Sequence, residues 1–422
     1  MIFDCHCHFF SKNDLTQDYR TASRLVKRIH DIPLTENREG PDKVLRFMDH
    51  MLNYQAEHLF LKMRETYGEE YVAVPLMMDG TYVTTRAGED YEKTSALNRI
   101  GEQIRSPLNT LRNKPSEPNL AHGKKDLFAH NFTTQMNELK RLKRVYPQNI
   151  YPFLGIDPRR DNHDLKGILM ELIQERVGPG KTFAGIKLYT ALGYSPTHPF
   201  LMGEGKVKPG LYGWCQKKGI PITVHFAPTG FAHINDSVKI EGDVYFPEAG
   251  EIVPGEELYE GGIMTFEKRF WRNSFNEMVE ERQLLLNHPL LWRKVLEAYP
   301  RLKINFAHMG GYQQAPLYLE GDPRGFWTKA ALGFLQDYSR VRVDLSNFHS
   351  SGPGPDLLEG VKGQIYDKLS RSCKKRVLYG SDFYMLYLVE KELNTYFSRF
   401  CRCFGNSMNL LARENPQSFL NL

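Results

Sequence analysis

IFDCHCHF, at residues 2–9, is a β-rich run in which Asp4, His6 and His8 alternate with Cys5 and Cys7. Successive side chains of a strand point to opposite faces, so the acid and the two histidines are expected on one face and the two cysteines on the other. Two imidazoles that share a strand face can converge on one metal ion. The same face would carry Asp4 close to His6.

The run also admits a second interpretation, a Cys/His zinc site built on Cys5 and Cys7. Structural zinc sites usually space their cysteines by two to four residues and need a second cluster of ligands. The sequence has no CxxC pair, and Cys401 and Cys403 lie in a predicted helix. Taken alone, the HxH pair is weak evidence for a metal site, and ordinary core or surface histidines are the favoured interpretation.

Seven further β-rich runs follow, separated by segments whose apolar residues recur every three to four positions. Strands that alternate with helices indicate a parallel sheet with helical crossovers. Eight strands are the number that a closed (β/α)8 TIM barrel needs, and we predict this fold as a single domain over residues 1–422. The seven runs are 71–77 (YVAVPLM), 150–156 (IYPFLGI), 182–189 (TFAGIKLY), 222–226 (ITVHF), 303–308 (KINFAH), 341–345 (VRVDL) and 377–381 (VLYGS).

Two connections are too long for simple crossovers, residues 79–126 after the second run and 227–288 after the fifth. Loops longer than about 15 residues are usually functional or disordered. Both insertions leave the C-terminal ends of barrel strands, where active sites lie, so we expect them to form a cap over the site. Residues 20–41 are a third irregular piece on that face. Asp164 and Asn287 suit N-cap positions of helices.

Composition argues against several classes of protein. The net charge is +5, from 55 basic and 50 acidic residues, and clusters such as 140–144 (KRLKR) fit solvated helix faces better than a nucleic-acid footprint. We see no apolar stretch of membrane-spanning length and no signal peptide. Six cysteines in 422 residues are not a disulfide scaffold. We therefore expect a cytoplasmic protein without nucleic-acid or membrane partners.

Polar side chains stand at the C-terminal ends of otherwise apolar runs. His225 ends the fifth run, His308 the sixth, Asp382 follows the eighth, and Lys187 lies near the end of the fourth. In a barrel these ends surround one mouth, where polar residues are typical of catalysis. Burying such groups is costly without a partner, and a divalent cation is one. His349, past the seventh run, is expected in a loop or beside the substrate.

This pattern resembles the amidohydrolase superfamily, specifically the amidohydrolase-2 branch related to aminocarboxymuconate-semialdehyde decarboxylase. The resemblance covers the chain apart from the two insertions. It is carried by FDCHCHFF at the start, GIKLYTALGYSP at 185–196, ITVHFAP at 222–228, INFAHMGG at 304–311, VLYGSDF at 377–383 and the closing ENPQSFLNL at 414–422.

The resemblance implies that His6, His8, His225 and Asp382 bind a divalent metal. One Zn²⁺ is favoured, and Mn²⁺ or Fe²⁺ also suits three imidazoles and a carboxylate. Asp382 would orient and deprotonate a metal-bound water, whose pKa the metal lowers towards about 7. His308 would polarise the substrate or move a proton. Asp4 would fix an imidazole tautomer or cap the strand end.

Lys187 has two interpretations. In binuclear amidohydrolases a carboxylated lysine on the fourth strand bridges two metals, and Lys187 with His308 would complete that ligand set. In the decarboxylase-related branch the site is commonly mononuclear, and a plain lysine would bind a substrate carboxylate. We favour the single metal.

Arg159 and Arg160 follow the third run and are candidates for binding an acidic substrate, since guanidinium pairs with carboxylate; pairing with a nearby Asp is the competing interpretation. Tyr189 is a candidate pocket residue. The expected function is hydrolysis of an amide, lactone or ester in a small, anionic substrate. The alternatives are decarboxylation or hydration of an unsaturated or aromatic acid, and a binding protein on an inactive barrel. The resemblance also suggests a homodimer.

Overall fold

The computed structural model describes residues 1–9, 55–82, 130–162, 165, 167–203, 209–233, 237–266, 275–348, 357–383 and 393–422. Several features expected from the sequence lie outside these ranges. They are residues 20–41, the insertion 79–126 beyond residue 82, the N-cap Asp164 and the loop residue His349.

Eight short strands lie at the positions of the eight predicted runs. Both faces of these strands are buried, which is why each run is mostly apolar with single polar residues. The strands are β1 (Ile2–Cys7), β2 (Tyr71–Pro75), β3 (Phe153–Gly155), β4 (Gly185–Leu188), β5 (Ile222–Val224), β10 (Ile304–Phe306), β11 (Val341–Asp344) and β12 (Val377–Leu378).

These strands close into a ring. Six of them pair in the order β12-β11-β10-β5-β4-β3, β1 pairs with β2, and every one of these pairs is parallel. Parallel bridges from Ala73 to Ile150 and from Leu76 to Phe153 join β2 to β3. On the other side, the Cys5 amide donates to the Tyr379 carbonyl over 3.0 Å and the Asp382 amide to the His6 carbonyl over 2.7 Å. The predicted TIM barrel is confirmed.

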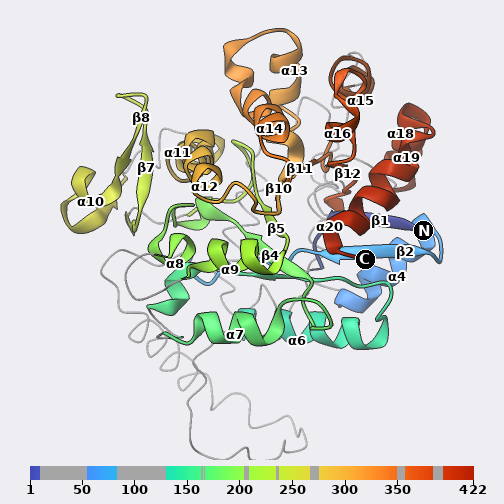
Figure 1. Ribbon diagram of the computed structural model, residues 1–422, viewed down its shortest axis with the longest axis horizontal. Helices are drawn as coiled ribbons and strands as arrows, with labels where there is room; N and C mark the ends of the chain where they lie inside the picture. The colour runs from blue at the N-terminus through green and yellow to red at the C-terminus, as the bar shows by residue number, and fades with distance from the viewer. Residues whose placement is uncertain are drawn as a thin grey trace, which may run out of the picture.

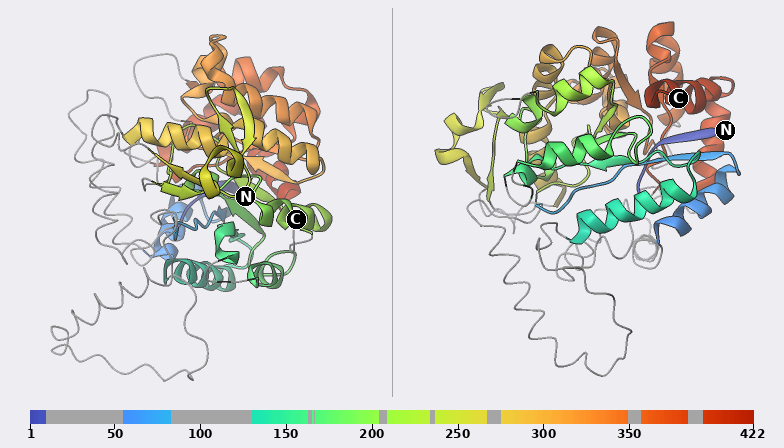
Figure 2. Two further views of the ribbon diagram at one scale, coloured as in Figure 1. Left: turned by 90° about the vertical axis from the view of Figure 1, so that its left-hand side faces the viewer. Right: turned by 60° about the horizontal axis from the view of Figure 1, so that its bottom comes forward.

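Helices surround the strands, as both views in Figure 2 show. The helices lie in the segments between the eight runs and after the last of them. The crossover and closing helices are α4 (Ala56–Tyr67), α6 (His130–Val145), α7 (Leu169–Arg176), α8 (Pro199–Met202), α9 (Leu211–Lys218), α12 (Pro289–Ala298), α13 (Gln314–Leu319), α14 (Phe326–Asp337), α15 (Leu357–Gly360), α16 (Arg371–Lys374), α18 (Leu393–Phe404), α19 (Ser407–Asn409) and α20 (Asn415–Leu420).

The barrel has an inner and an outer core. Phe3, Cys5 and Phe153 point inward and pack with Phe419 and Leu420 of the C-terminal helix. The opposite faces of the strands pack against the surrounding helices in a second, larger cluster. The C-terminal segment therefore fills one end of the barrel, and polar side chains are left to gather at the other end.

Part of the second insertion forms small antiparallel units and a helix. β6 (Ser237–Lys239) pairs with β9 (Ile263–Thr265), and β7 (Asp243–Phe246) with β8 (Glu251–Pro254). The β7–β8 hairpin and α10 (Gly255–Leu258) stand out from one side of the barrel in Figure 1. α11 (Phe275–Asn287) leads back to α12, whose N-cap is His288. The predicted capping role of Asn287 was wrong, because Asn287 ends the preceding helix.

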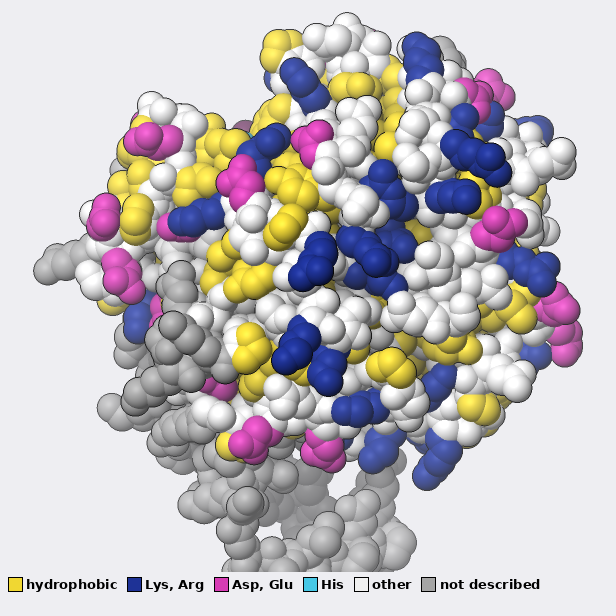
Figure 3. Space-filling model, viewed as in Figure 1, with side chains coloured by type: hydrophobic (Ala, Val, Ile, Leu, Met, Phe, Trp, Pro, Cys, Tyr) yellow, Lys and Arg dark blue, Asp and Glu magenta, His cyan; other side chains and the backbone are white. Residues whose placement is uncertain are grey.

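The surface carries dispersed charge. On the face shown in Figure 3, Lys and Arg side chains lie among neutral and apolar ones. A groove of about 350 Å³ is lined by α6 and the turn 180–182 and includes Lys140, Arg141 and Lys143. Two of these side chains have partners. Arg141 forms an ion pair with Glu57 at 2.7 Å, and the Lys143 ammonium lies 4.0 Å from the centre of the Tyr151 ring. No helix in the described ranges is both long and apolar enough to cross a bilayer.

Candidate metal centre

A bulge in β1 sets the direction of the HxH pair. Asp4 lies opposite Ala73 and Cys7 opposite Pro75, so two residues of β1 face one of β2. Such a bulge interrupts the alternation of side chains. Cys5 therefore points into the barrel with Phe3, while Cys7 packs in the outer core, so the prediction that the two cysteines share one face was wrong.

The bulge also separates Asp4 from the His6 imidazole. The Asp4 carboxylate accepts from the backbone amide of Ser381 at 2.8 Å and from the Tyr71 hydroxyl at 3.0 Å. Burial raises its pKa to about 6 against the lowering effect of these hydrogen bonds. Its bond to His6 is to the backbone amide at 3.3 Å, so Asp4 joins β1 to the end of β12 and does not orient an imidazole.

His6 and His8 both point into the mouth of the barrel. Their ring centroids are 5.3 Å apart, and His6 lies 4.6 Å from the ring of His308. The His8 Nε2 atom lies 3.8 Å from a carboxylate oxygen of Asp382. Burial, with the nearby charges of His6 and Lys187, lowers the pKa of His8 well below its usual value, so His8 is neutral and able to bind a metal.

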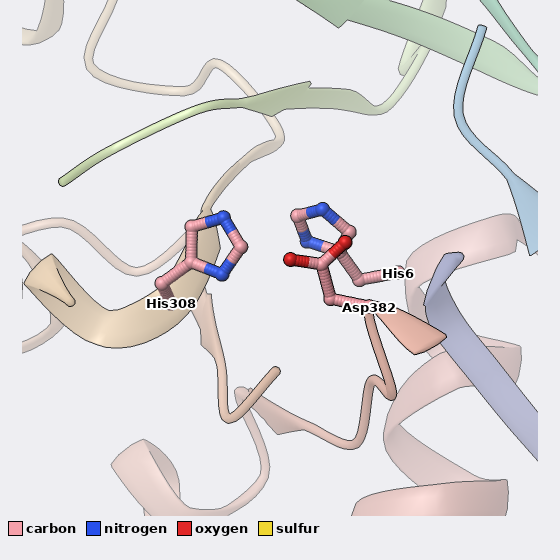
Figure 4. A group of neighbouring side chains, drawn as sticks. All are labelled: His6, His308 and Asp382. Atoms are coloured by element: carbon pink, nitrogen blue, oxygen red, sulfur yellow. The ribbon is translucent and has the colours of Figure 1, made fainter. Parts of the chain in front are cut away.

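Three of these side chains form the tightest group. One possible ligand atom from each of His6, His308 and Asp382 lies within 4.8 Å of the others, and all three residues are buried. Figure 4 shows the two rings and the carboxylate facing a common space. His308 and Asp382 have left-handed backbones, with φ of 62° and 50°. Non-glycine residues adopt this region at a cost, and such strain clusters at functional sites.

His225 comes to the same mouth but stands outside this tight group. Its ring stacks on Tyr189 at 4.1 Å and lies 5.1 Å from the ring of His308. Its Nε2 atom is 2.7 Å from the carbonyl oxygen of Thr229. Gly230 has a φ of 111°, and a side chain there would collide with the His225 ring. The predicted ligand His225 is thus close to the group of His6, His308 and Asp382, and its Nε2 atom is held by the loop that follows it.

The insertion helix α11 supports this loop. The Gln283 side-chain amide donates to the carbonyls of Thr229 and Phe231 at 3.2 and 3.1 Å. The Asn287 amide donates to the His225 carbonyl at 3.1 Å, while its oxygen accepts from Trp292 at 2.7 Å. Asn287 thus connects the insertion to a predicted ligand, a role that its position in the sequence did not reveal.

Lys187 points inward from β4 and is 2% exposed. Its ammonium has no hydrogen-bond partner among the residues that the structure describes, and its nearest aromatic contact is the Tyr189 ring at 5.7 Å. Burial lowers its pKa to about 8, although the charges of Asp344 and Asp382 oppose the shift. An unpaired buried cation is costly unless a ligand pairs with it.

Both arginines after β3 already have carboxylate partners. Arg159 binds Asp157 through two nitrogens, at 2.9 and 2.6 Å. Arg160 is fully buried and forms an ion pair with Asp79, and its guanidinium lies 4.0 Å from the Phe132 ring. The Arg159 pair matches the competing interpretation, whereas Arg160 pairs with an Asp that is buried and distant in sequence. Their role in substrate binding stays a prediction, as does that of Tyr189.

Sequence reasoning missed Asp344 and Ser346. Asp344 lies at the end of β11, and its carboxylate accepts from the backbone amide of His308 at 2.9 Å and from Asn305 at 2.7 Å. Burial raises the pKa of Asp344, but the nearby His6 and His308 rings and the hydrogen bonds with His6 and Ser346 outweigh burial, so the pKa lies well below its usual value and the acid is ionised. The signal was present, because Asp344 is a polar residue at the C-terminal end of an apolar run.

The donor set fits a divalent cation. It combines buried imidazoles with one carboxylate, which are ligands typical of zinc. Burial and the charge of His6 lower the pKa of His308 to about 3, so this ring is neutral as well. Burial raises the pKa of Asp382 despite the charges of His6 and Lys187. A bound cation would offset the cost of burying the ionised Asp382 carboxylate. The geometry shows a possible His/Asp metal site without identifying the metal.

Comparison with known structures finds similar barrels at low identity. An uncharacterised TIM-barrel protein of Bordetella bronchiseptica is 12% identical, covers 100% of this chain and 98% of its own, and has a TM-score of 0.48. A probable 2-pyrone-4,6-dicarboxylic acid hydrolase of Acinetobacter baumannii is 11% identical, with coverage of 100% and 99% and a TM-score of 0.48. A 2,6-dihydroxybenzoate decarboxylase from Rhizobium is 13% identical, with coverage of 100% and 98% and a TM-score of 0.45.

No curated protein matches the sequence. A family model does, the amidohydrolase model of the amidohydrolase-2 branch, over residues 169–388. This range contains Lys187, His225, His308 and Asp382 and ends beyond the last barrel strand. Since the model matches just over half of the chain, the protein belongs to the amidohydrolase family, in its amidohydrolase-2 branch.

Proposed function

We propose that this chain is a metal-dependent hydrolase that cleaves an amide, lactone or ester bond in a small substrate bearing a carboxylate. The observation that carries the proposal is the group of His6, His308 and Asp382, whose ligand atoms lie within 4.8 Å of one another at the barrel mouth. His8 lies beside this group, with its Nε2 atom 3.8 Å from Asp382. We propose His6, His8, His225 and Asp382 as ligands of a single metal, with zinc favoured.

A divalent cation bound there would supply Lewis acidity and lower the pKa of an attacking water. The Asp382 carboxylate would accept the proton of that water. His308 would move a proton between the reacting groups.

Lys187 would bind the substrate carboxylate. Its buried ammonium is unpaired among the described residues, and it lies on the strand between Arg159–Arg160 and His225 in barrel order. A substrate anion would offset the cost of burying this charge. Arg159, which is less deeply buried than Arg160, would supply a second cation at the rim.

The insertion after β5 would cover the bound substrate. Helix α11 reaches the loop after β5 through Gln283 and Asn287, and its residue Val279 packs in one cluster with Tyr189. Excluding water from the mouth would strengthen the electrostatic interactions within it. The cap is thus the part of the site that would set substrate size.

A decarboxylase acting on an unsaturated or aromatic acid is the second candidate, and the same Lys187 favours it. The ammonium would hold a substrate carboxylate close to the metal group, which serves loss of CO2 as well as recognition. The two candidates differ in which bond of the substrate breaks.

The deciding experiment supplies zinc-loaded protein with two panels of substrates. One panel holds lactones, esters and amides that bear a carboxylate, followed by acid release; the other holds aromatic and unsaturated acids, followed by CO2 release. We expect acid release that disappears in Asp382→Asn and persists in Ser195→Ala, a buried serine that bonds Thr197. CO2 release alone would replace the hydrolase with the decarboxylase, and turnover by Asp382→Asn would refute the assigned base.

A further inference from the structure

One serine hydroxyl lies between the two histidines of the group formed by His6, His308 and Asp382. The Ser346 Oγ atom is 3.1 Å from His6 Nδ1 and 2.8 Å from His308 Nδ1, and it also donates a hydrogen bond to Asp344 Oδ1. Ser346 and Asp344 are fully buried. Neither residue belongs to the ligand set expected from the sequence.

The hydrogen bonds fix where the protons are. His6 Nδ1 also lies 3.2 Å from Asp344 Oδ2, and His308 Nδ1 lies 3.4 Å from the Ser346 carbonyl oxygen. Carboxylate and carbonyl oxygens only accept hydrogen bonds, so each Nδ1 must carry a hydrogen. The Ser346 hydroxyl can then accept from both rings while its own hydrogen goes to Asp344. Every donor and acceptor in this arrangement is paired.

We propose that Ser346 and Asp344 are positioning residues that hold His6 and His308 as Nδ1–H tautomers, so that His6 presents Nε2 to the metal and His308 presents Nε2 to the reacting groups beside it. The inference rests on the metal centre proposed above. It adds that one hydroxyl and one carboxylate orient a metal ligand and a proton-transfer residue on different strands. Partners of this kind commonly contribute a factor of about 10 to 100 in metal affinity.

The other two histidines provide an internal contrast. His8 Nδ1 lies 2.7 Å from the Leu76 carbonyl, so His8 is also an Nδ1–H tautomer. In His225 it is Nε2 that faces a carbonyl, that of Thr229, at 2.7 Å. His225 therefore holds its hydrogen on Nε2 and its lone pair on Nδ1. The site thus contains both tautomers at known positions.

The test reads these tautomers directly. Long-range ¹H–¹⁵N spectra of metal-free protein labelled on histidine distinguish the two forms, and the variants His6→Gln, His8→Gln, His308→Gln and His225→Gln assign the signals. We expect Nδ1–H for His6, His8 and His308, and Nε2–H for His225. An Nε2–H signal for His6 or His308 would overturn the proposal.

A substitution of equal size sharpens the test. The amides of His308 and Ser346 donate to Asp344 Oδ1, at 2.9 and 3.1 Å, so in Asp344→Asn the amide oxygen must stay there. The new NH₂ group would then face His6 Nδ1, and the His6 proton would move to Nε2. Asn305 can rotate to accept from the NH₂ group, since its own oxygen lacks a partner among the described residues.

Zinc affinity, measured by competition with a chromogenic chelator, should fall about 10- to 100-fold in Asp344→Asn. The control is Asp243→Asn, a carboxylate of the insertion that pairs with Lys294 at 2.6 Å, and it should bind zinc as the wild type does. If Asp344→Asn bound zinc as tightly as the wild type, the proposed positioning role of Asp344 would be refuted. Wild-type protein that binds no zinc would refute the metal centre instead, while the tautomer signals would still decide the proton assignment.

Discussion

Replacing Lys187 with methionine should make the protein more stable while impairing its function. Methionine keeps the length of the side chain and removes the charge. One pKa unit corresponds to about 1.4 kcal/mol, so a pKa lowered from 10.5 to about 8 means that the buried ammonium costs about 3 kcal/mol at pH 7. We therefore expect metal-free Lys187→Met to gain about 2 to 3 kcal/mol in free energy of unfolding at pH 7.

The sign of the effect depends on pH. Between pH 8 and 10.5 the unfolded chain binds a proton that the folded chain has released, so wild-type stability from this group rises with pH. The advantage of Lys187→Met is complete below pH 8 and vanishes by about pH 10.5. Urea unfolding at pH 7, 8, 9 and 10 measures it, with far-UV circular dichroism as the signal.

A second buried lysine is the matched control. Burial also lowers the pKa of Lys303 to about 8, but its ammonium donates to the carbonyls of Ser418 and Phe419 at 3.1 and 3.2 Å. Lys303→Met removes a charge whose pKa is lowered to the same value but also leaves those carbonyls unpaired, so it should gain less stability than Lys187→Met. A gain in Lys187→Met no larger than that in Lys303→Met would contradict an unpaired ammonium at Lys187. Loss of metal from Lys187→Met would instead favour the carboxylated bridge.

Three further outcomes are expected. With a carboxylate-bearing substrate, kcat/KM should fall as pH rises through about 8, because Lys187 loses its charge. With an uncharged analogue of the substrate, kcat/KM should not fall in this pH range. Cys7→Ala should keep the metal content of the wild type in mass spectrometry, since Cys7 packs in the outer core, and loss of metal would favour the Cys/His interpretation. Gly380→Ala would bring a new methyl to 2.7 Å from the His6 side chain and 3.0 Å from the Ser346 side chain. Zinc affinity measured by chelator competition should therefore drop. Unchanged affinity would contradict this packing.

The barrel was predictable because its strands have a local signature. Each of the eight strands lies within a short apolar run bounded by helical periodicity, and the polar residues His225, His308 and Asp382 mark the ends that meet at one mouth. Only the order of the runs and these strand ends were needed. Asp344 is likewise a polar residue at the end of an apolar run and could have been predicted in the same way.

The remaining details depend on contacts between distant residues. The bulge in β1 follows from its register with β2, and it moves Cys5 inward and Asp4 away from His6. Arg160 pairs with Asp79, which lies 81 positions away in sequence. His225 is held in place by hydrogen bonds with the Thr229 carbonyl and with Asn287 of helix α11. Alternation along a single strand contains none of this information.

Metal content per chain tests the central claim most directly. Protein purified without chelator or added metal is analysed by inductively coupled plasma mass spectrometry, beside the His6→Ala variant. The account predicts about one zinc ion per wild-type chain and a clear loss in the variant. Wild-type protein that holds no metal, even after incubation with Zn²⁺ and Mn²⁺, would contradict it.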